Sequence, residues 1–327
     1  MSSNTIQEDK RLIKLIERTY SNCKDISLEG ENYFIPMIKI QNFIFGEKKI
    51  SLPFLDIGGV FGDITPKRLK EIFNKKIKNG EIRINEYQKN FKKNLDILKK
   101  AGFHKKESKA QFYIEIENPE FKWNKFHKHT RNEIRKAKKN NLRIERIENL
   151  NELEKFYKLY FYEMKRFGTP CHSYNFFKNM LEIFNEDFFG INCYLNKNLI
   201  ASGILIFEKE VAYLWFNVSD SQYRINKPND LIYWTTIIES FKRKIKWIDV
   251  GQIDINPENE REKNLKRFKE KWLGKRYKKF IFYYPKKELE KIGNKKEKLK
   301  KFRKVWRYLP SPIIKLIGPW VTSHFVI

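Results

Sequence analysis

Beyond residue 141 the sequence alternates runs of strand character with longer segments of helical periodicity, in an order that fits few folds. We expect strands at 142–147, 188–195, 199–207, 211–218, 246–251 and 278–284, and helices at 150–167, 173–184, 229–244 and 259–270. The segments 196–198 and 208–210 have the length of hairpin connections. This order predicts an α+β fold with a mostly antiparallel sheet flanked by helices.

The first 120 residues mix the same two elements. Their periodicity predicts helices at 9–20, 66–79 and 88–101, and strands at 33–41, 49–52, 81–85 and 110–117. Gly58 and Gly59, in the stretch SLPFLDIGGVFGD, form either a loop that lets the backbone approach a ligand or an ordinary tight turn. We expect an N-terminal lobe at 1–120, a second lobe at 121–285 and a tail at 286–327.

The charge balance points to anionic partners. The chain has 68 Lys and Arg against 40 Asp and Glu, a net charge of +28, while 41% apolar and 15% aromatic residues indicate a globular protein. The segment 121–143 contains nine Lys or Arg and one acidic residue, and we expect a helix at 123–139 within it. Cations spaced three and four residues apart form either a phosphate-contacting stripe or a solvated face: Lys128, Arg131, Arg135 and Lys138.

Several function classes lack their usual sequence pattern. The chain has no phosphate-binding P-loop, dinucleotide fingerprint, nucleophile elbow or HExxH helix. Its three cysteines predict neither disulfides nor a zinc cluster, and they favour a reducing cytoplasm. His127 and His129 stand among lysines without further clustered ligands, so we expect no metal site. Cys171, His172 and the other His residues are widely scattered, so a Cys–His nucleophilic pair has as little support as a metal site, although the sequence does not exclude it.

One lysine stands out in the helix at 259–270. Leu265, Phe268 and Trp272 share a face of this helix, and Lys269 is beside them. Such a lysine is either held firmly against core aromatics or is an ordinary surface lysine.

Four stretches together resemble the Fem-type aminoacyltransferases, which are relatives of the GNAT acyltransferases. They are RNEIRKAKKNNLRIE at 131–145, FYKLYFYEMKRFGTPCHSYNFF at 156–177, LIASGILIF at 199–207 and RFKEKWLG at 267–274. Two further stretches, ISLPFLDIGGVFGD at 50–63 and WRYLPSPIIKLIGPW at 306–320, are most similar to the FemAB-like branch associated with exopolysaccharide and protein-sorting gene systems.

The resemblance implies tandem GNAT-like lobes with an acceptor site between them. It also implies transfer of an amino acid from aminoacyl-tRNA to the amine of a cell-wall precursor carried on a nucleotide or lipid. Phe268 and Lys269 match the family's aromatic and lysine pair. The chain lacks the coiled-coil arm that several Fem proteins use for tRNA, so acyl-CoA stays open as the donor. However, 219–230 has none of the glycines with which enzymes of this fold hold coenzyme A phosphates.

We therefore expect an acyl- or aminoacyltransferase that forms an amide on an amine-bearing, phosphate-linked cell-envelope precursor, without a tightly bound cofactor. Lys269 would meet the charge that develops on the carbonyl oxygen, with Phe268 setting its direction. Tyr223, Arg224 and Lys227 would orient an anionic group. The alternatives are an N-acyltransferase that uses acyl-CoA and a non-catalytic protein that binds RNA or anionic lipid.

The C-terminal tail combines charge with apolar character. Residues 286–327 contain twelve Lys or Arg against three Glu, and the apolar tract at 313–327 is too short to span a bilayer. The tail either lies on an anionic membrane, which would place a cytoplasmic protein at the inner face, or packs against a lobe.

Overall fold

The computed structural model describes residues 10–41, 46–54, 58–257, 259–290, 302–303 and 305–324. Two compact units make up the chain. The first consists of Met1–Ala110, Gly168–His172 and Tyr277–Ile327, and the second of Gln111–Phe167 and Ser173–Arg276. The expected lobe boundaries at 120 and 285 stay a prediction.

The second unit follows the order of elements predicted from the sequence. Its strands are β9 Leu142–Ile147, β10 Phe188–Leu195, β11 Asn198–Glu208, β12 Val211–Ser219 and β13 Trp247–Asp254. Its helices are α4 Pro119–Lys125, α5 Lys128–Lys139, α6 Leu150–Phe167, α7 Tyr174–Phe184, the 3₁₀ helix η3 Ser221–Asn226, α8 Pro228–Lys242 and α9 Glu260–Lys271. Strands β8 His104–Glu115 and β14 Gly274–Tyr284 have residues in both units.

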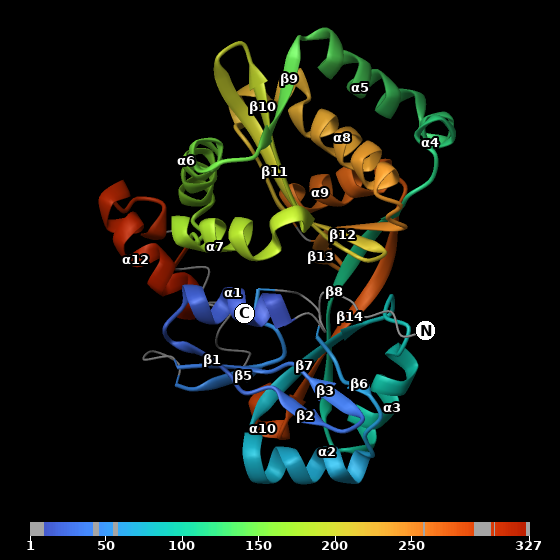
Figure 1. Ribbon diagram of the computed structural model, residues 1–327, viewed down its shortest axis with the longest axis vertical. Coiled ribbons are helices and arrows are strands. Elements are labelled where there is room, and N and C mark those ends of the chain that lie inside the picture. The colour runs from blue at the N-terminus through green and yellow to red at the C-terminus, as the bar shows by residue number, and fades with distance from the viewer. Residues whose placement is uncertain are drawn as a thin grey trace. The chain divides into compact units, whose positions relative to one another are not determined.

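The sheet of the second unit runs β8-β13-β12-β11-β10-β9 and is antiparallel from β12 to β9. Alternate residues of its strands face different helices. Asn192 donates a hydrogen bond to the Glu152 carbonyl oxygen on α6, whereas Gly203 lies against Ile232 on α8. Helices α6 and α8 therefore cover opposite faces of the sheet (Figure 1). The predicted α+β class, with a mixed and mostly antiparallel sheet flanked by helices, is confirmed.

The expected single helix at 123–139 is wrong: α4 and α5 are separate helices. Phe126 has extended backbone and is buried, with its ring edge-on to the rings of Trp234 and Trp272. His127 begins the next helix, and its Nδ1 accepts a hydrogen bond from the His129 N–H. The charge pattern alone predicts one continuous helix, but burial of Phe126 breaks the segment into two helices.

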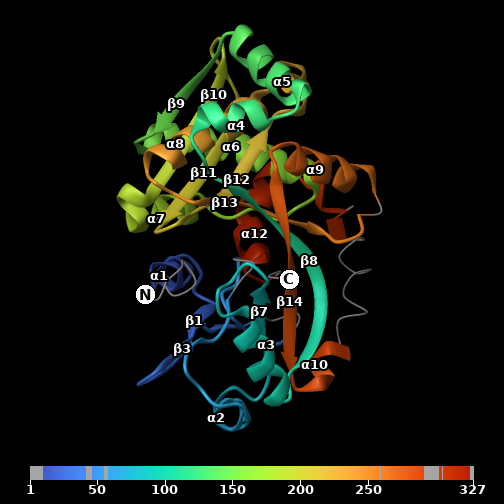
Figure 2. The ribbon, with the colours of Figure 1, turned by 90° about the vertical axis from the view of Figure 1, so that its right-hand side faces the viewer.

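The first unit is a smaller sheet with helices packed against it. Its helices are α1 Lys10–Thr19, α2 Pro66–Ile72, which continues as the π-helix η1 Phe73–Ile77, α3 Phe91–Lys100, α10 Lys286–Glu290 and α12 Ser311–His324. Its strands are β1 Cys23–Asp25, β2 Leu28–Gly30, β3 Tyr33–Ile35, β4 Ile38–Ile40, β5 Lys48–Ile50, β6 Phe61–Gly62 and β7 Gly80–Asn85. The larger sheet here runs β1-β4-β5-β7-β14. Figure 2 shows α3 beside β7, and residues of both elements belong to the unit's apolar core.

The glycine pair of the N-terminal lobe is held by side chains of the same unit. Gln88 donates to the Gly58 carbonyl oxygen at 2.7 Å, and Asn90 donates to that of Val60 at 2.9 Å. Gly59 has a φ of 131°, which glycine adopts without strain. Residues 55–57 of the expected loop lie outside the described residues. The described part is an irregular segment whose backbone is held by amide side chains.

The C-terminal helix α12 packs within the first unit. The Thr322 hydroxyl donates to the Cys171 carbonyl oxygen at 2.8 Å, and Ile314 and Val321 are buried. Residues 291–301 and Lys304 of the basic tail lie outside the described residues. Among the helices that the structure describes, none has the length and apolar character needed to cross a membrane.

Candidate active site

Strands β12 and β13 run parallel and then part. They pair at three positions, from Val211 with Trp247 to Tyr213 with Asp249, although both strands continue for several residues. Beyond this point the backbone N–H and C=O groups on the facing edges need other partners. The end of the paired stretch is therefore a place where polar groups can gather inside the domain.

Asp249 stands at this point and is buried, with 5% of its surface exposed. Gln111 Nε2 of β8 donates to both of its carboxylate oxygens, at 2.6 and 2.8 Å. The Gly251 N–H donates to Asp249 Oδ1 at 2.7 Å, closing an Asx turn. Gly251 has a φ of 79°, so this turn needs the conformational freedom of glycine. The carboxylate thus fixes the chain just after the strands separate.

Lys269, in the last turn of α9, is 4% exposed, and its ammonium lies at the same turn. Its Nζ donates to the Gln252 carbonyl oxygen at 3.3 Å and lies 5.8 Å from the Phe112 ring centroid. A Cβ added at Gly251 would lie 3.5 Å from this nitrogen. A buried ammonium is costly unless it is held by oxygen atoms or charge. Of the two interpretations drawn from the sequence, the structure therefore supports the one in which Lys269 is held firmly rather than free on the surface.

A substitution at Gly251 can be compared with a control substitution that should cost similar stability. In Gly251→Ala the left-handed backbone should cost about 1–2 kcal/mol of the free energy of unfolding, and the new methyl should take up space beside the Lys269 ammonium. We expect acyl transfer to fall about tenfold or more. Gly46 has a φ of 73° with nothing near its Cβ position, so Gly46→Ala should cost similar stability in chemical denaturation without changing transfer. Equal rates in the two variants would contradict this placement of the site.

Phe268 packs against α8. Its ring contacts Tyr233 edge-on, with centroids 4.9 Å apart, and the Lys271 Nζ lies 4.4 Å from its ring centroid. Phe268 thereby seats α9 against α8, and its role in directing Lys269 stays a prediction. Burial, with smaller contributions from Asp230 and Asp249, raises the pKa of Tyr233, so this phenol keeps its proton at neutral pH.

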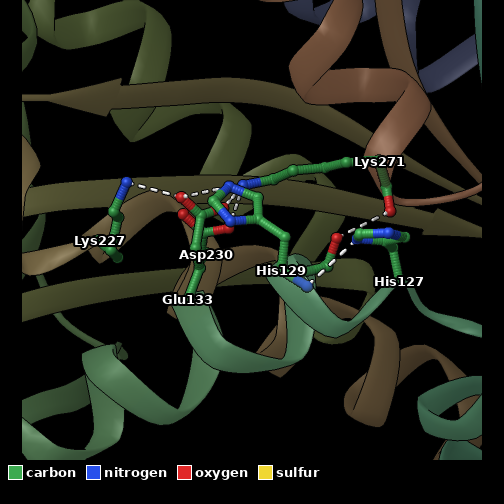
Figure 3. Close-up of polar contacts among 7 residues, drawn as sticks. His127, His129, Glu133, Lys227, Asp230 and Lys271 are labelled. Carbon is green, nitrogen blue, oxygen red and sulfur yellow. Dashed lines mark hydrogen bonds and ion pairs between the residues drawn. The ribbon is translucent and has the colours of Figure 1, made fainter.

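A second polar cluster joins α5, α8 and α9 (Figure 3). Glu133 accepts from Lys227 Nζ and Lys271 Nζ, each at 2.6 Å, and Lys271 also contacts Asp230. Burial alone would raise the pKa of Glu133, but the bonds from the two lysines outweigh it and hold the pKa at about 2. Burial raises the pKa of Asp230 above its ordinary value in spite of Lys271. This ion cluster, Glu133, Lys227, Asp230 and Lys271, fixes α9 two residues beyond Lys269.

The three residues expected to orient an anionic group lie around η3. Lys227 is engaged with Glu133, the Tyr223 hydroxyl accepts from Asn198 Nδ2 at 3.4 Å, and Arg224 is exposed. The structure thus places Lys227 in the ion cluster and leaves Arg224 on the surface. Their substrate-binding role stays a prediction.

Several N–H groups of the segment at 219–230 are used within the segment. Those of Tyr223, Lys227 and Asp230 donate to carbonyl oxygens within the segment, at 3.1 or 3.2 Å. Pro228, at the first turn of α8, has no N–H, and Asp230 adds a carboxylate there. A pyrophosphate held at a helix N-terminus needs free N–H groups and no competing anion. These features do not favour a coenzyme A phosphate site here, and the identity of the donor stays a prediction.

The cationic stripe lies entirely on α5. Lys128, Arg135 and Lys138 are exposed and Arg131 is half-buried. The Arg135 guanidinium lies 5.3 Å from the Trp123 ring centroid, and Lys138 Nζ lies 6.0 Å from that of Trp234. Cations that lie beside indole rings can bind anions that contain aromatic rings. A helix face that only contacts solvent can have the same geometry, so these contacts do not decide between the two interpretations.

A charge-matched experiment separates these interpretations of the stripe. Changing Lys128, Arg131, Arg135 and Lys138 to Gln should reduce the slope of log affinity for tRNA against log salt by about three to four units. The control changes exposed lysines of the first unit: Lys67, Lys70, Lys75 and Lys76. If both variants lose the same slope, the stripe is only a solvated face.

Neither a metal site nor a cysteine nucleophile finds support in the geometry. Within the described residues, no three His, Cys, Asp or Glu side chains are placed to hold a metal ion. Burial raises the pKa of the Cys171 thiol to about 11, which leaves little thiolate at neutral pH. Burial lowers the pKa of His172 to about 3, and its Nδ1 contacts the Tyr20 hydroxyl.

Comparison with known proteins identifies the class of the second unit. Residues 124–269 match the family described as acetyltransferase (GNAT) domain. This stretch runs from α4 to Lys269 and includes the parting strands β12 and β13. The chain therefore carries a GNAT acyltransferase domain, and the predicted relation to this family is confirmed.

Solved structures share the fold over most of the chain. FemX matches with a TM-score of 0.63 and 14% identity, covering 86% of this chain and 93% of its own. The C-terminal domain of a putative lysylphosphatidylglycerol synthetase from Agrobacterium fabrum matches at 0.60 and 11%, covering 86% and 92%. L-PGS from Bacillus licheniformis matches at 0.57 and 8%, covering 94% and 98%. No curated protein matches the chain by sequence.

Proposed function

We propose that this protein is a Fem-type transferase that forms an amide between an acyl group, foremost an aminoacyl group, and an amine on a phosphate-linked cell-envelope precursor. The observation that carries the proposal is the buried Lys269 ammonium where β12 and β13 part, beside the turn that Asp249 holds. Support also comes from the likeness to FemX and to a putative synthetase named for lysylphosphatidylglycerol, in which lysine is joined to a lipid.

The reaction requires the protein to position the two substrates and to supply a positive charge. When an amine attacks an ester or thioester carbonyl, negative charge develops on the carbonyl oxygen. A cation already fixed at that oxygen stabilises the transition state without reorganising. Lys269 supplies this cation, and Asp249 with Gln111 positions the turn beside it. The bond between the acyl carbon and the donor's oxygen or sulfur then breaks, and the proton lost by the amine goes to this leaving oxygen or sulfur, which completes the amide.

The segment before α8 supports one choice of donor. The N–H groups of Tyr223, Lys227 and Asp230 are used within it and Asp230 places a carboxylate at the helix start, which disfavours binding of coenzyme A phosphates there. We therefore favour an aminoacyl ester such as aminoacyl-tRNA over acyl-CoA. Phosphate contacts by the α5 stripe would suit either RNA or a phosphorylated acceptor.

The test compares the two donor classes on one acceptor. The full chain is incubated with a nucleotide-linked peptide that has a free amine, and with either isotope-labelled aminoacyl-tRNA or labelled acyl-CoA. We expect label in the peptide from aminoacyl-tRNA, at least tenfold faster than from acyl-CoA. Faster transfer from acyl-CoA would instead assign the alternative, an N-acyltransferase of the common GNAT kind. Binding of tRNA or anionic lipid without transfer from either donor would assign the non-catalytic alternative.

A further inference from the structure

Helix α12 presents two different faces. Its inner face packs within the first unit: Ile314 and Val321 are buried, and a Cβ added at Gly318 would lie 3.0 Å from Cys171 Sγ. The close approach at Gly318 and the bond from Thr322 to the Cys171 carbonyl oxygen fix the rotation of the helix about its axis. Its other face is therefore held toward solvent.

The outer face of α12 is apolar. Ile313, Leu316 and Trp320 are 43%, 81% and 45% exposed, at the three- and four-residue spacing of a single helix face. Tyr308, just before the helix, is 88% exposed. Single exposed apolar residues are common on protein surfaces, but a continuous row on one helix indicates a binding surface.

The part of the chain that carries this face has charge of one sign. Residues 298–327 contain seven Lys or Arg and no Asp or Glu. Of these, Arg303, Arg307 and Lys315 are described, and all three are exposed. An apolar row that contains a tryptophan and is flanked along the chain by Lys and Arg is complementary to a surface with anionic groups over an apolar layer.

We propose that the outer face of α12 docks the protein onto an anionic lipid surface. Leu316, Ile313 and Trp320 enter the boundary between headgroups and acyl chains, and Arg303, Arg307 and Lys315 contact lipid phosphates at the rim. The helix has 14 residues, too few to span a bilayer, so it lies in the plane of the interface. The two faces thus combine the alternatives drawn from the sequence: the tail packs on the protein and also binds lipid.

This inference goes beyond the proposed reaction and stands apart from it. Lys269 belongs to the second unit and α12 to the first. Lys269→Met should therefore bind vesicles as the unsubstituted chain does, while it loses transfer. A failure of vesicle binding and a failure of acyl transfer are thus distinguishable.

The experiment is co-sedimentation of the full chain with vesicles of phosphatidylglycerol and phosphatidylcholine, and with vesicles of phosphatidylcholine alone. The test variant is Ile313→Ser with Leu316→Ser, and the matched control is Phe121→Ser with Ile225→Ser. The control residues are 67% and 69% exposed and lie in the second unit. Circular dichroism and thermal unfolding show whether each variant is folded.

We expect the unsubstituted chain and the control to bind the anionic vesicles alike, and the test variant about tenfold or more weakly, because less apolar surface enters the interface. Binding to phosphatidylcholine alone should be at least tenfold weaker for every chain. The proposal is overturned if the unsubstituted chain does not bind anionic vesicles, if the test variant binds as the control does, or if both vesicle types bind equally.

A second measurement changes only Trp320 in the apolar row. Brominated phosphatidylglycerol quenches indoles that enter the acyl region, so quenching of the unsubstituted chain should exceed that of Trp320→Phe. Equal quenching in the two chains would place Trp320 outside the lipid and would contradict the docking.

Discussion

Replacing Lys269 with Met is expected to lower transfer by about 100-fold or more and to leave the chain folded. Met keeps much of the side-chain length that packs beside Phe112, but it removes the ammonium held near Gly251. The transition state then loses its preorganised cation, whereas binding of donor and acceptor is largely kept. Single-turnover rates at saturating donor separate these two effects.

The control for Lys269→Met is Lys263→Met on the same helix. Lys263 lies on the surface and pairs with Glu260 at 3.0 Å, so its loss should change neither transfer nor stability beyond a few tenths of a kcal/mol. Unchanged turnover in Lys269→Met, or an equal loss in both variants, would remove Lys269 from the proposed chemistry.

Glu133→Gln is expected to lower the free energy of unfolding at neutral pH by about 3 kcal/mol. Glu133 is the carboxylate shared by Lys227 and Lys271, so its amide leaves two largely buried ammonium groups without this compensating charge. Urea unfolding at pH 7 measures the loss. The control, Glu154→Gln, removes the exposed ion pair with Lys158 on α6 and should cost under 1 kcal/mol.

The same variant has a defined pH dependence. The pKa of Glu133 is about 2 in the folded chain, against an ordinary value of 4.5. A lowered pKa means that the stabilisation is complete above about pH 4.5 and is lost as the pH falls toward 2. The difference between Glu133→Gln and the unsubstituted chain should therefore be equal at pH 7 and 5.5 and smaller at pH 3.5. A difference that grows on acidification would contradict the ion cluster.

Much of the second unit follows from local patterns in its sequence. The bounds expected for one helix and two strands, at 150–167, 142–147 and 188–195, agree with α6, β9 and β10. Their periodicity and turn residues are local, so tertiary contacts change them little. The break between α4 and α5 could not be predicted in this way, because it depends on the burial of Phe126 between Trp234 and Trp272.

The site was only partly visible from the sequence. The helical pattern at 261–274 and the family resemblance both indicate Lys269, the resemblance adds Phe268, and neither indicates Gln111 or Asp249. Gln111 and Asp249 are 138 residues apart, and so are Glu133 and Lys271. The packing of distant strands and helices brings such residues together, and this packing cannot be predicted from the pattern of any single segment. A polar residue inside an apolar strand, as Asp249 is in WIDVGQID, is the one local signal that could have indicated them.

The most direct test of the central claim is the linkage in the product. The unsubstituted chain and Lys269→Met are each given aminoacyl-tRNA with a labelled amino acid and an amine-bearing, phosphate-linked precursor, and the products are analysed by mass spectrometry before and after mild alkali. We predict labelled product that survives alkali, as an amide does, formed at least about 100-fold more slowly by Lys269→Met. Label lost to alkali, or the same amide formed equally by both chains, would contradict amide transfer at the Lys269 site.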